Sequence, residues 1–209
     1  MTGVLPRRHV LGLAAAAVLA AVGRAAAQVP ASSLPIHALN DALLQIMHAG
    51  AKAAFGERAR IVAPVIDAVF DLPQILKTSV GTRWSALPIP QQIELTEVFR
   101  RYTVASYVAN FNGFSGEKFE VLPQVRAAGA DQIVPSRIVP TTGEPIRIDY
   151  VMRQAGDTWK IEDVLLDGSI SRVAVQRSDF RGLLASGNAT ALIASLKAKT
   201  ATLEAGGKS

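Results

Sequence analysis

The sequence predicts an α+β fold in which a curved antiparallel sheet packs against a layer of helices. Two observations lead to this fold class. Apolar residues recur at helical spacing through the first half of the chain and again at its end, and between about residues 118 and 166 their period changes to two. Helices followed by consecutive strands favour segregated layers over a parallel sheet with alternating helices. With 209 residues and no internal repeat, the chain is long enough for one domain with a buried core.

The N-terminus is typical of a secretory signal peptide over residues 1–27. A basic pair at Arg7 and Arg8 precedes a run rich in Ala, Leu and Val, and three alanines end at Ala27. The apolar run is shorter than the roughly 20 residues of a membrane-spanning helix, which favours cleavage over a membrane anchor. The pair also resembles a twin-arginine signal, although Pro6 stands where Ser or Thr is expected, so that route and the general secretory route both stay open. We expect a mature domain of residues 28–209 in the periplasm.

Charge and cysteine content exclude several functions. The leader removes three arginines from the chain's 22 lysines and arginines, which leaves 19 basic against 17 acidic residues and no basic cluster. A nucleic-acid partner is therefore not expected. Because the chain has no cysteine, disulfides, thiol catalysis and cysteine-ligated zinc are excluded.

Helical spacing predicts three segments in the first half of the mature domain. They cover residues 36–54, 60–76 and a run of about five turns from Pro90 that ends near the loop "NFNGFSG". Pro64 must then occupy a first turn or a kink. Helical spacing returns over residues 171–187, and Asn188 is expected to cap a final helix.

Four segments read as strands: 118–127, 132–141, 146–154 and 157–166. The last begins with regular alternation but ends in the apolar run Val164–Leu166. We interpret this run as a place where Val164 and Leu166 continue the inner wall while Leu165 contacts helices behind the sheet.

Residues suited to catalysis or metal binding are few. His37 and His48 are eleven positions apart, about 16 Å on one helix, and cannot share a metal ion. His37 and Asp41 are one turn apart, which is more typical of a surface pair than of a metal site. The loop "GFSGE" lacks the second glycine of a nucleophile elbow and lies between a helix and a strand, which is the wrong order. We therefore predict no catalytic residue, no metal and no cofactor.

Apolar and aromatic residues are spread over both the helical half and the inner face of the sheet. This pattern fits an ordinary core as well as a ligand cavity, and periodicity alone does not separate the two.

Three stretches resemble the MlaC family, the periplasmic lipid-binding component of the Mla/toluene-tolerance ABC transport systems. They are "VFDLPQILKTSVGTRWSAL", "QQIELTEVFRRYTVASY" and "TWKIEDVLLDGSIS…VQRSDF". The resemblance covers roughly Phe55 to Leu196. Leu95 stands where the family usually has Phe, and the interval from Gly168 to Arg177 is one residue longer than usual. The longer interval and "YVANF" resemble the hopanoid-associated branch called HpnM.

The resemblance implies a cavity between sheet and helices that holds a phospholipid or a hopanoid. Its partners would be membrane-bound lipid transport complexes in the inner and outer membranes. The predicted lipid-binding residues are Phe70, Leu72, Leu76, Trp84, Phe99, Tyr102, Tyr107, Ile148, Tyr150, Met152, Val164 and Leu166. Exposing the methylenes of a 16-carbon chain to water costs on the order of 12 kcal/mol, so a shallow groove would not suffice.

Three residues are predicted to have structural roles: Asp163, Arg177 and Gly168. Asp163 is expected on an apolar strand face, where a bare carboxylate would be costly, and Arg177 is its expected partner from the following helix. Two further functions stay open. An enzyme acting on a bound lipid would have to use Asp163 with Arg177 or Tyr107, and an adaptor would act through protein contacts alone.

Overall fold

The computed structural model describes Met1, residues 29–185 and residues 187–207. Beyond Met1, the predicted signal peptide lies outside the described residues. The helices are α1 (Leu34–Ala49), α2 (Phe55–Val69), α3 (Leu72–Val80), α4 (Ile89–Asn110), α5 (Arg172–Arg181) and α6 (Thr190–Glu204), with 3-10 turns η1 (Ala31–Ser33) and η2 (Gly81–Ala86). The strands are β1 (Lys118–Val121), β2 (Arg126–Ala128), β3 (Asp131–Val139), β4 (Ile146–Ala155), β5 (Thr158–Leu166) and β6 (Ile170–Ser171).

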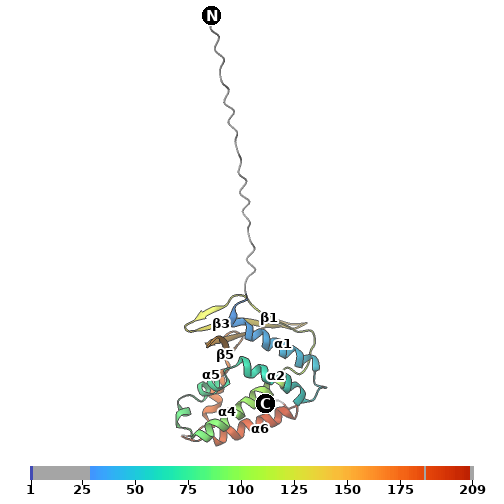
Figure 1. Ribbon diagram of the computed structural model, residues 1–209. Coiled ribbons are helices and arrows are strands. Elements are labelled where there is room, and N and C mark those ends of the chain that lie inside the picture. The colour runs from blue at the N-terminus through green and yellow to red at the C-terminus, as the bar shows by residue number, and fades with distance from the viewer. Residues whose placement is uncertain (2–28, 186, 208–209) are drawn as a thin grey trace.

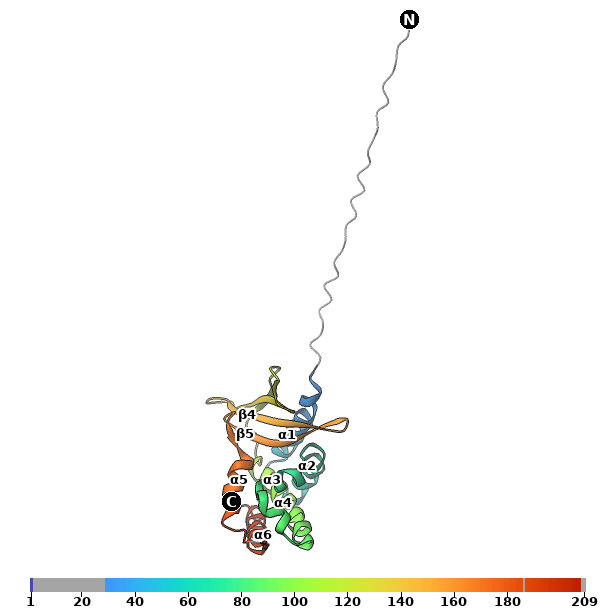
Figure 2. The same cartoon turned by 90° about the vertical axis from the view of Figure 1, so that its left-hand side faces the viewer.

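The strands form one antiparallel sheet, and the helices pack against one of its faces. The strand order is β1-β3-β4-β5-β6, and β2 pairs with the remaining length of β3. Figures 1 and 2 show the sheet as one layer, with α1 and α2 beside it and α4 and α6 farthest from it. The predicted α+β fold with an antiparallel sheet on helices is confirmed.

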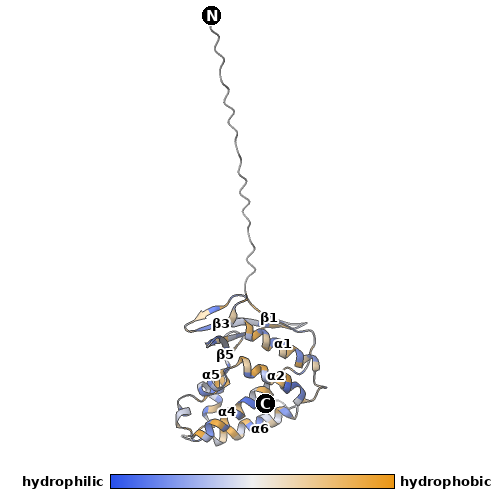
Figure 3. Cartoon of the chain, viewed as in Figure 1, coloured by the Kyte–Doolittle hydropathy of each residue, from blue (hydrophilic) through white to orange (hydrophobic). Residues whose placement is uncertain are grey.

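Apolar residues of the helices supply most of the core. Figure 3 shows hydrophobic residues recurring along the helices beneath the sheet, and those on α1 and α4 include fully buried leucine and phenylalanine side chains. Such amphipathic helices are stabilised mainly by burying one stripe against neighbouring elements. Within residues 29–185 and 187–207, no helix has both the length and the hydropathy needed to span a bilayer.

The segment predicted as one helix over residues 60–76 is two helices. Phe70 is extended and forms a bridge to Ile161 of β5, which interrupts the helical hydrogen bonds between α2 and α3. Asp71 then caps α3, because its side chain accepts a hydrogen bond from the backbone N–H of Gln74 at 3.0 Å. Pro64 lies inside α2 and not in its first turn, so of the two positions predicted for it only that of a kink is left.

A β-bulge explains the loss of alternation in β5. Val151 of β4 pairs with Asp163, whereas the next residue, Met152, pairs with Ile161. Glu162 is thus an extra residue on β5. A bulge of this kind shifts the alternation by one position, so the strand presents apolar residues to the helices on both sides of the bulge.

Beyond the bulge, alternation resumes in a new phase. Val164 and Leu166 pair with the two β4 residues that face the helices, while Leu165 pairs with Asp149. Leu165 therefore lies on the opposite face, where Figures 1 and 2 place no helix. The expected contact of Leu165 with helices behind the sheet is wrong.

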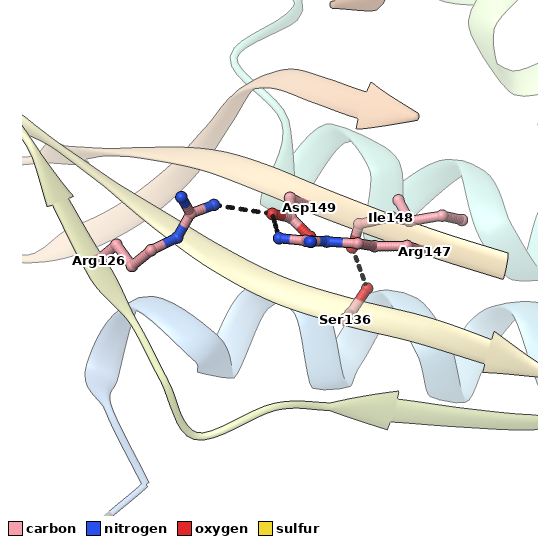
Figure 4. A network of polar contacts seen from close by, with 5 residues as sticks. All are labelled: Arg126, Ser136, Arg147, Ile148 and Asp149. Carbon is pink, nitrogen blue, oxygen red and sulfur yellow. Dashed lines mark hydrogen bonds and ion pairs between the residues drawn. The ribbon is translucent and has the colours of Figure 1, made fainter. Parts of the chain in front are cut away.

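A buried carboxylate organises this outer face of the sheet. The side chain of Asp149 has no exposed surface, and it accepts hydrogen bonds from Arg126 at 2.9 Å and from Arg147 at 2.8 and 2.9 Å (Figure 4). Close by, the Ser136 hydroxyl donates to the carbonyl of Ile148 at 2.6 Å. The arginines supply the counter-charge without which burial of Asp149 would be costly.

Gly168 has the structural role of making room for one of these arginines. It adopts φ +72°, and a Cβ at this position would lie 2.6 Å from Nε of Arg147. Both the left-handed backbone and the close approach disfavour a side chain here.

Candidate functional site

A cavity of about 320 Å³ lies between the helices and the sheet, within the usual range for small-molecule sites. Its walls come from the α2–α3 junction, α3, α4, the inner faces of β4 and β5, and the first turns of α5. The residues that line it are Phe70, Leu72, Ile75, Phe99, Tyr102, Thr103, Ser106, Tyr107, Asn110, Phe111, Ile148, Tyr150, Asp163, Val164, Leu166, Arg172, Val173 and Gln176. The side chains are mainly aliphatic and aromatic, as expected for a site that binds an apolar ligand.

The structure brings nine of the twelve predicted lipid-binding residues to this cavity. They are Phe70, Leu72, Phe99, Tyr102, Tyr107, Ile148, Tyr150, Val164 and Leu166. Tyr107 packs against Phe70 and Phe111, with ring centroids 5.7 and 6.0 Å apart. Aromatic rings from the α2–α3 junction and from the end of α4 thus pack against one another in the cavity wall.

The other three predicted residues lie outside the cavity. Leu76 is fully buried in the core, because the cavity-facing positions of α3 are Leu72 and Ile75. Met152 is also fully buried and pairs with Ile161, on the far side of the bulge from the cavity. Trp84 lies in η2 and packs, half-buried, against the core. Shared hydrophobicity alone did not distinguish core from cavity wall.

Several lining residues were missed by the sequence analysis. On α4 the missed residues are Thr103, Ser106 and Asn110. They follow Phe99 by four, seven and eleven positions, which are helical spacings, so extending the apolar stripe of this helix would have predicted them. For Arg172 and Gln176 of α5, no sequence pattern indicated the cavity.

Two polar residues of α5, Arg172 and Gln176, line the cavity. The exposed residue Arg172 lines it, so the cavity reaches the surface at this point. Gln176 also lines it and accepts a hydrogen bond from the Ser79 hydroxyl at 3.1 Å, which joins α5 to α3. An amphipathic ligand could therefore place its apolar part among the aromatic residues and its polar part beside Arg172.

Two of the three tyrosines that line the cavity, Tyr107 and Tyr150, remain uncharged. Burial raises the pKa of Tyr150, and burial together with the neighbouring Tyr150 raises the pKa of Tyr107, an effect that Arg172 partly opposes. Both phenols are thus held in the neutral form, which can donate a hydrogen bond but brings no charge into an apolar site.

Because the pKa values of Tyr107 and Tyr150 are raised in the fold, we expect the protein to lose stability in strong alkali. In the unfolded chain a tyrosine loses its proton near pH 10, but in the fold Tyr150 keeps it to higher pH. Above about pH 10 the unfolded state therefore binds fewer protons, and each such tyrosine should lower the free energy of unfolding by up to about 1.4 kcal/mol per pH unit. Urea unfolding between pH 9 and 11 should show a shallower decline for Tyr150→Phe, and parallel curves for both proteins would contradict this.

Asp163 connects β5 to the start of α5. Its carboxylate accepts hydrogen bonds from the backbone N–H of Val164 at 2.8 Å and of Val173 at 3.0 Å, and from the hydroxyl of Ser171. Ser171 is also the N-cap of α5 and accepts from the N–H of Ala174. A carboxylate is favourable at the N-terminal end of a helix, where backbone N–H groups are free.

The expected pairing of Asp163 with Arg177 is wrong. Arg177 lies more than one helical turn after the start of α5, and its side chain is close to Gly81 of η2. The Asp163 carboxylate instead accepts its hydrogen bonds from groups close to it, including a backbone N–H at the start of α5. Asp163 thus joins β5 to α5 through partners other than the one expected.

We expect Asp163→Asn to reduce stability without changing the bound ligand. The amide oxygen can accept from the two backbone N–H groups that donate to Oδ1, but the amide nitrogen then faces the Ser171 hydroxyl, which donates to Oδ2 in the wild-type protein. The loss of charge-assisted hydrogen bonds should cost about 1.5–3 kcal/mol. Calorimetry should show a lower melting temperature, while mass spectra of the purified variant should show the same ligand as wild type. An unchanged melting temperature would show that the Asp163 carboxylate does not stabilise the fold.

The described residues hold no group of three or more His, Asp or Glu side chains placed to bind a metal ion. His37 and His48 both lie on the exposed side of α1. In the loop "GFSGE", Glu117 accepts a hydrogen bond from the N–H of Ser115 at 2.7 Å, so its side chain closes the turn.

The fold and the cavity together define a class: α+β domains in which helices and one face of an antiparallel sheet enclose a site for an apolar ligand. The model of the family described as MlaC protein matches residues 37–198. The chain belongs to the MlaC family, which confirms the resemblance read from its motifs.

A solved structure has the same fold. It is the phospholipid-binding protein from Ralstonia solanacearum in complex with a phospholipid, which superimposes with a TM-score of 0.71 at 21% sequence identity. The match covers 83% of this chain and 98% of that one. A search of curated proteins finds no match to this chain.

Proposed function

We propose that this protein is a soluble periplasmic lipid carrier that moves a phospholipid or a hopanoid between the inner and outer membranes, as part of a lipid trafficking system linked to an ABC transporter. The observation that carries the proposal is the apolar cavity between sheet and helices, with its polar edge at Arg172 and Gln176. Family membership and the phospholipid in the Ralstonia structure support the same ligand class.

The energetics of transfer favour this reading. Each methylene that leaves a membrane for water costs about 0.8 kcal/mol, so a carrier must supply an equally apolar environment. A cavity walled by aromatic and aliphatic side chains does so, and because its affinity need only approach that of a membrane, the lipid can be released again. The protein stores no energy, so the direction of transport would come from the membrane-bound complexes at either end.

Catalysis on the bound lipid is less well supported. Asp163 is the carboxylate in the cavity wall, and its oxygens already accept three hydrogen bonds. The nearby phenols are kept neutral by burial. Three of the roughly four lone-pair sites of this carboxylate are occupied, and a neutral phenol is a weak base, so neither group is well placed to act as a general base.

Native mass spectrometry of protein exported by its own leader and purified without detergent tests the proposal. The expected spectrum shows a polypeptide beginning at or near Gln28 and a mass increase that corresponds to an intact lipid. A protein free of lipid would favour an adaptor, and a chemically altered lipid would favour an enzyme. Retention of Arg7 and Arg8 in a membrane fraction would contradict the periplasmic assignment.

A further inference from the structure

A second pocket, of about 190 Å³, lies on the surface where η2 meets α5. Its lining residues are Val80, Thr82, Arg83, Arg177, Arg181 and Leu184. None of these lines the apolar cavity. Three arginines thus converge on one small pocket, and no described aspartate or glutamate is among its lining residues.

The fold holds these arginines in place. Arg177 lies against Gly81, where a Cβ would be 3.2 Å from one of its terminal nitrogens and 3.4 Å from Nε. Gly81 also has φ +70°, a conformation that side chains disfavour. Arg83 donates a hydrogen bond to the carbonyl of Arg181 at 2.8 Å and so fixes η2 to the last turn of α5.

Three positive side chains held this close together would be stabilised by a bound anion. Arg177 and Arg181 are four positions apart on one helix, where like charges repel each other, and Arg83 adds a third positive group from η2. The C-terminal end of a helix favours a single cation nearby, which does not account for three. With no acid in the lining, the repulsion is relieved when an anion binds.

We propose that this pocket binds a phosphate group, either free or carried on a lipid headgroup. A guanidinium is a planar fork whose N–H donors fit the oxygens of phosphate in pairs. Three such forks, of which that of Arg83 already donates once to the Arg181 carbonyl, still offer more donors than the two oxygens of one carboxylate can accept, which favours a tetrahedral oxyanion with more acceptor oxygens. This site is independent of the lipid carried in the apolar cavity.

The first test is thermal unfolding in inorganic phosphate, compared with sodium chloride at the same ionic strength. For wild type the midpoint of thermal unfolding should rise as phosphate fills the site, by about 3–6 °C when the phosphate concentration is ten times the Kd. Arg181→Gln should lose this rise. The matched control is Arg60→Gln, an exposed arginine that donates only within α2 and should leave the rise intact. Equal midpoints in chloride for all three proteins would show that the variants fold.

The second test separates the two sources of phosphate. Wild type and Arg181→Gln are sedimented with phosphatidylglycerol vesicles and with phosphatidylcholine vesicles. Greater binding of wild type to the anionic vesicles alone identifies a lipid headgroup, while a saturable phosphate effect without that difference identifies free phosphate. The proposal is overturned if phosphate acts equally on wild type and Arg181→Gln, as general salt stabilisation would, and vesicle binding is also equal.

Discussion

Val164→Glu should abolish co-purification of lipid with this protein. Val164 lines the apolar cavity and pairs with Tyr150 across the sheet. A carboxylate there would lie without a partner among aromatic and aliphatic side chains, at a cost of several kcal/mol when a lipid chain excludes water from it. Because affinity falls tenfold for each 1.4 kcal/mol, the bound fraction should drop by at least two orders of magnitude. Native mass spectrometry measures the ratio of lipid-bound to free protein.

The same loss is expected for Ile148→Glu, which places the charge on the neighbouring strand of the same wall. A matched control is Thr158→Glu, an exposed position on β5 outside the cavity, which should retain wild-type loading. Arg147 is unsuitable as a control, since its side chain holds Asp149. Equal lipid loading in all these variants would show that Val164 and Ile148 do not line the lipid-binding site.

Removal of both partners of Asp149 should cause the largest loss of stability. In the double variant Arg126→Gln/Arg147→Gln, a carboxylate with no exposed surface loses both of its ion pairs. Leaving the Asp149 charge buried and unpaired should cost about 3–5 kcal/mol. For a domain of this size, that corresponds to a fall of roughly 10 °C in melting temperature, measured by calorimetry.

The single variants should lose much less than the double variant, because the remaining arginine still pairs with Asp149. Arg137→Gln is the control on the same face of the sheet, since the exposed Arg137 pairs with the partly exposed Glu120, and such surface pairs contribute about 0–1 kcal/mol. If the two single losses simply add up to that of the double variant and remain small, Asp149 does not depend on these arginines.

The sequence by itself determined most of the helices and strands and the apolar character of the faces that they turn inward. The spacing of apolar residues in α4 and β4 places Phe99 and Tyr102, and likewise Ile148 and Tyr150, on faces that turn out to line one cavity. The prediction succeeds because the helical period of 3.6 residues and the strand period of two are properties of the local backbone. These periods determine which side chains share a face, and therefore which are buried together. The motifs around Phe70 and Asp163 were sufficient to indicate the family.

Only the tertiary structure decided which apolar residues line the cavity and which fill the core. Leu76 and Met152 have the same hydropathy pattern as their cavity-lining neighbours, but the turn of α3 and the bulge in β5 place them elsewhere. The partners of charged groups were also decided at this level. Asp163 bonds to the start of α5, and Asp149 to Arg126 from another strand. Such contacts join residues distant in sequence, whose separation depends on how whole elements pack and not on any local spacing.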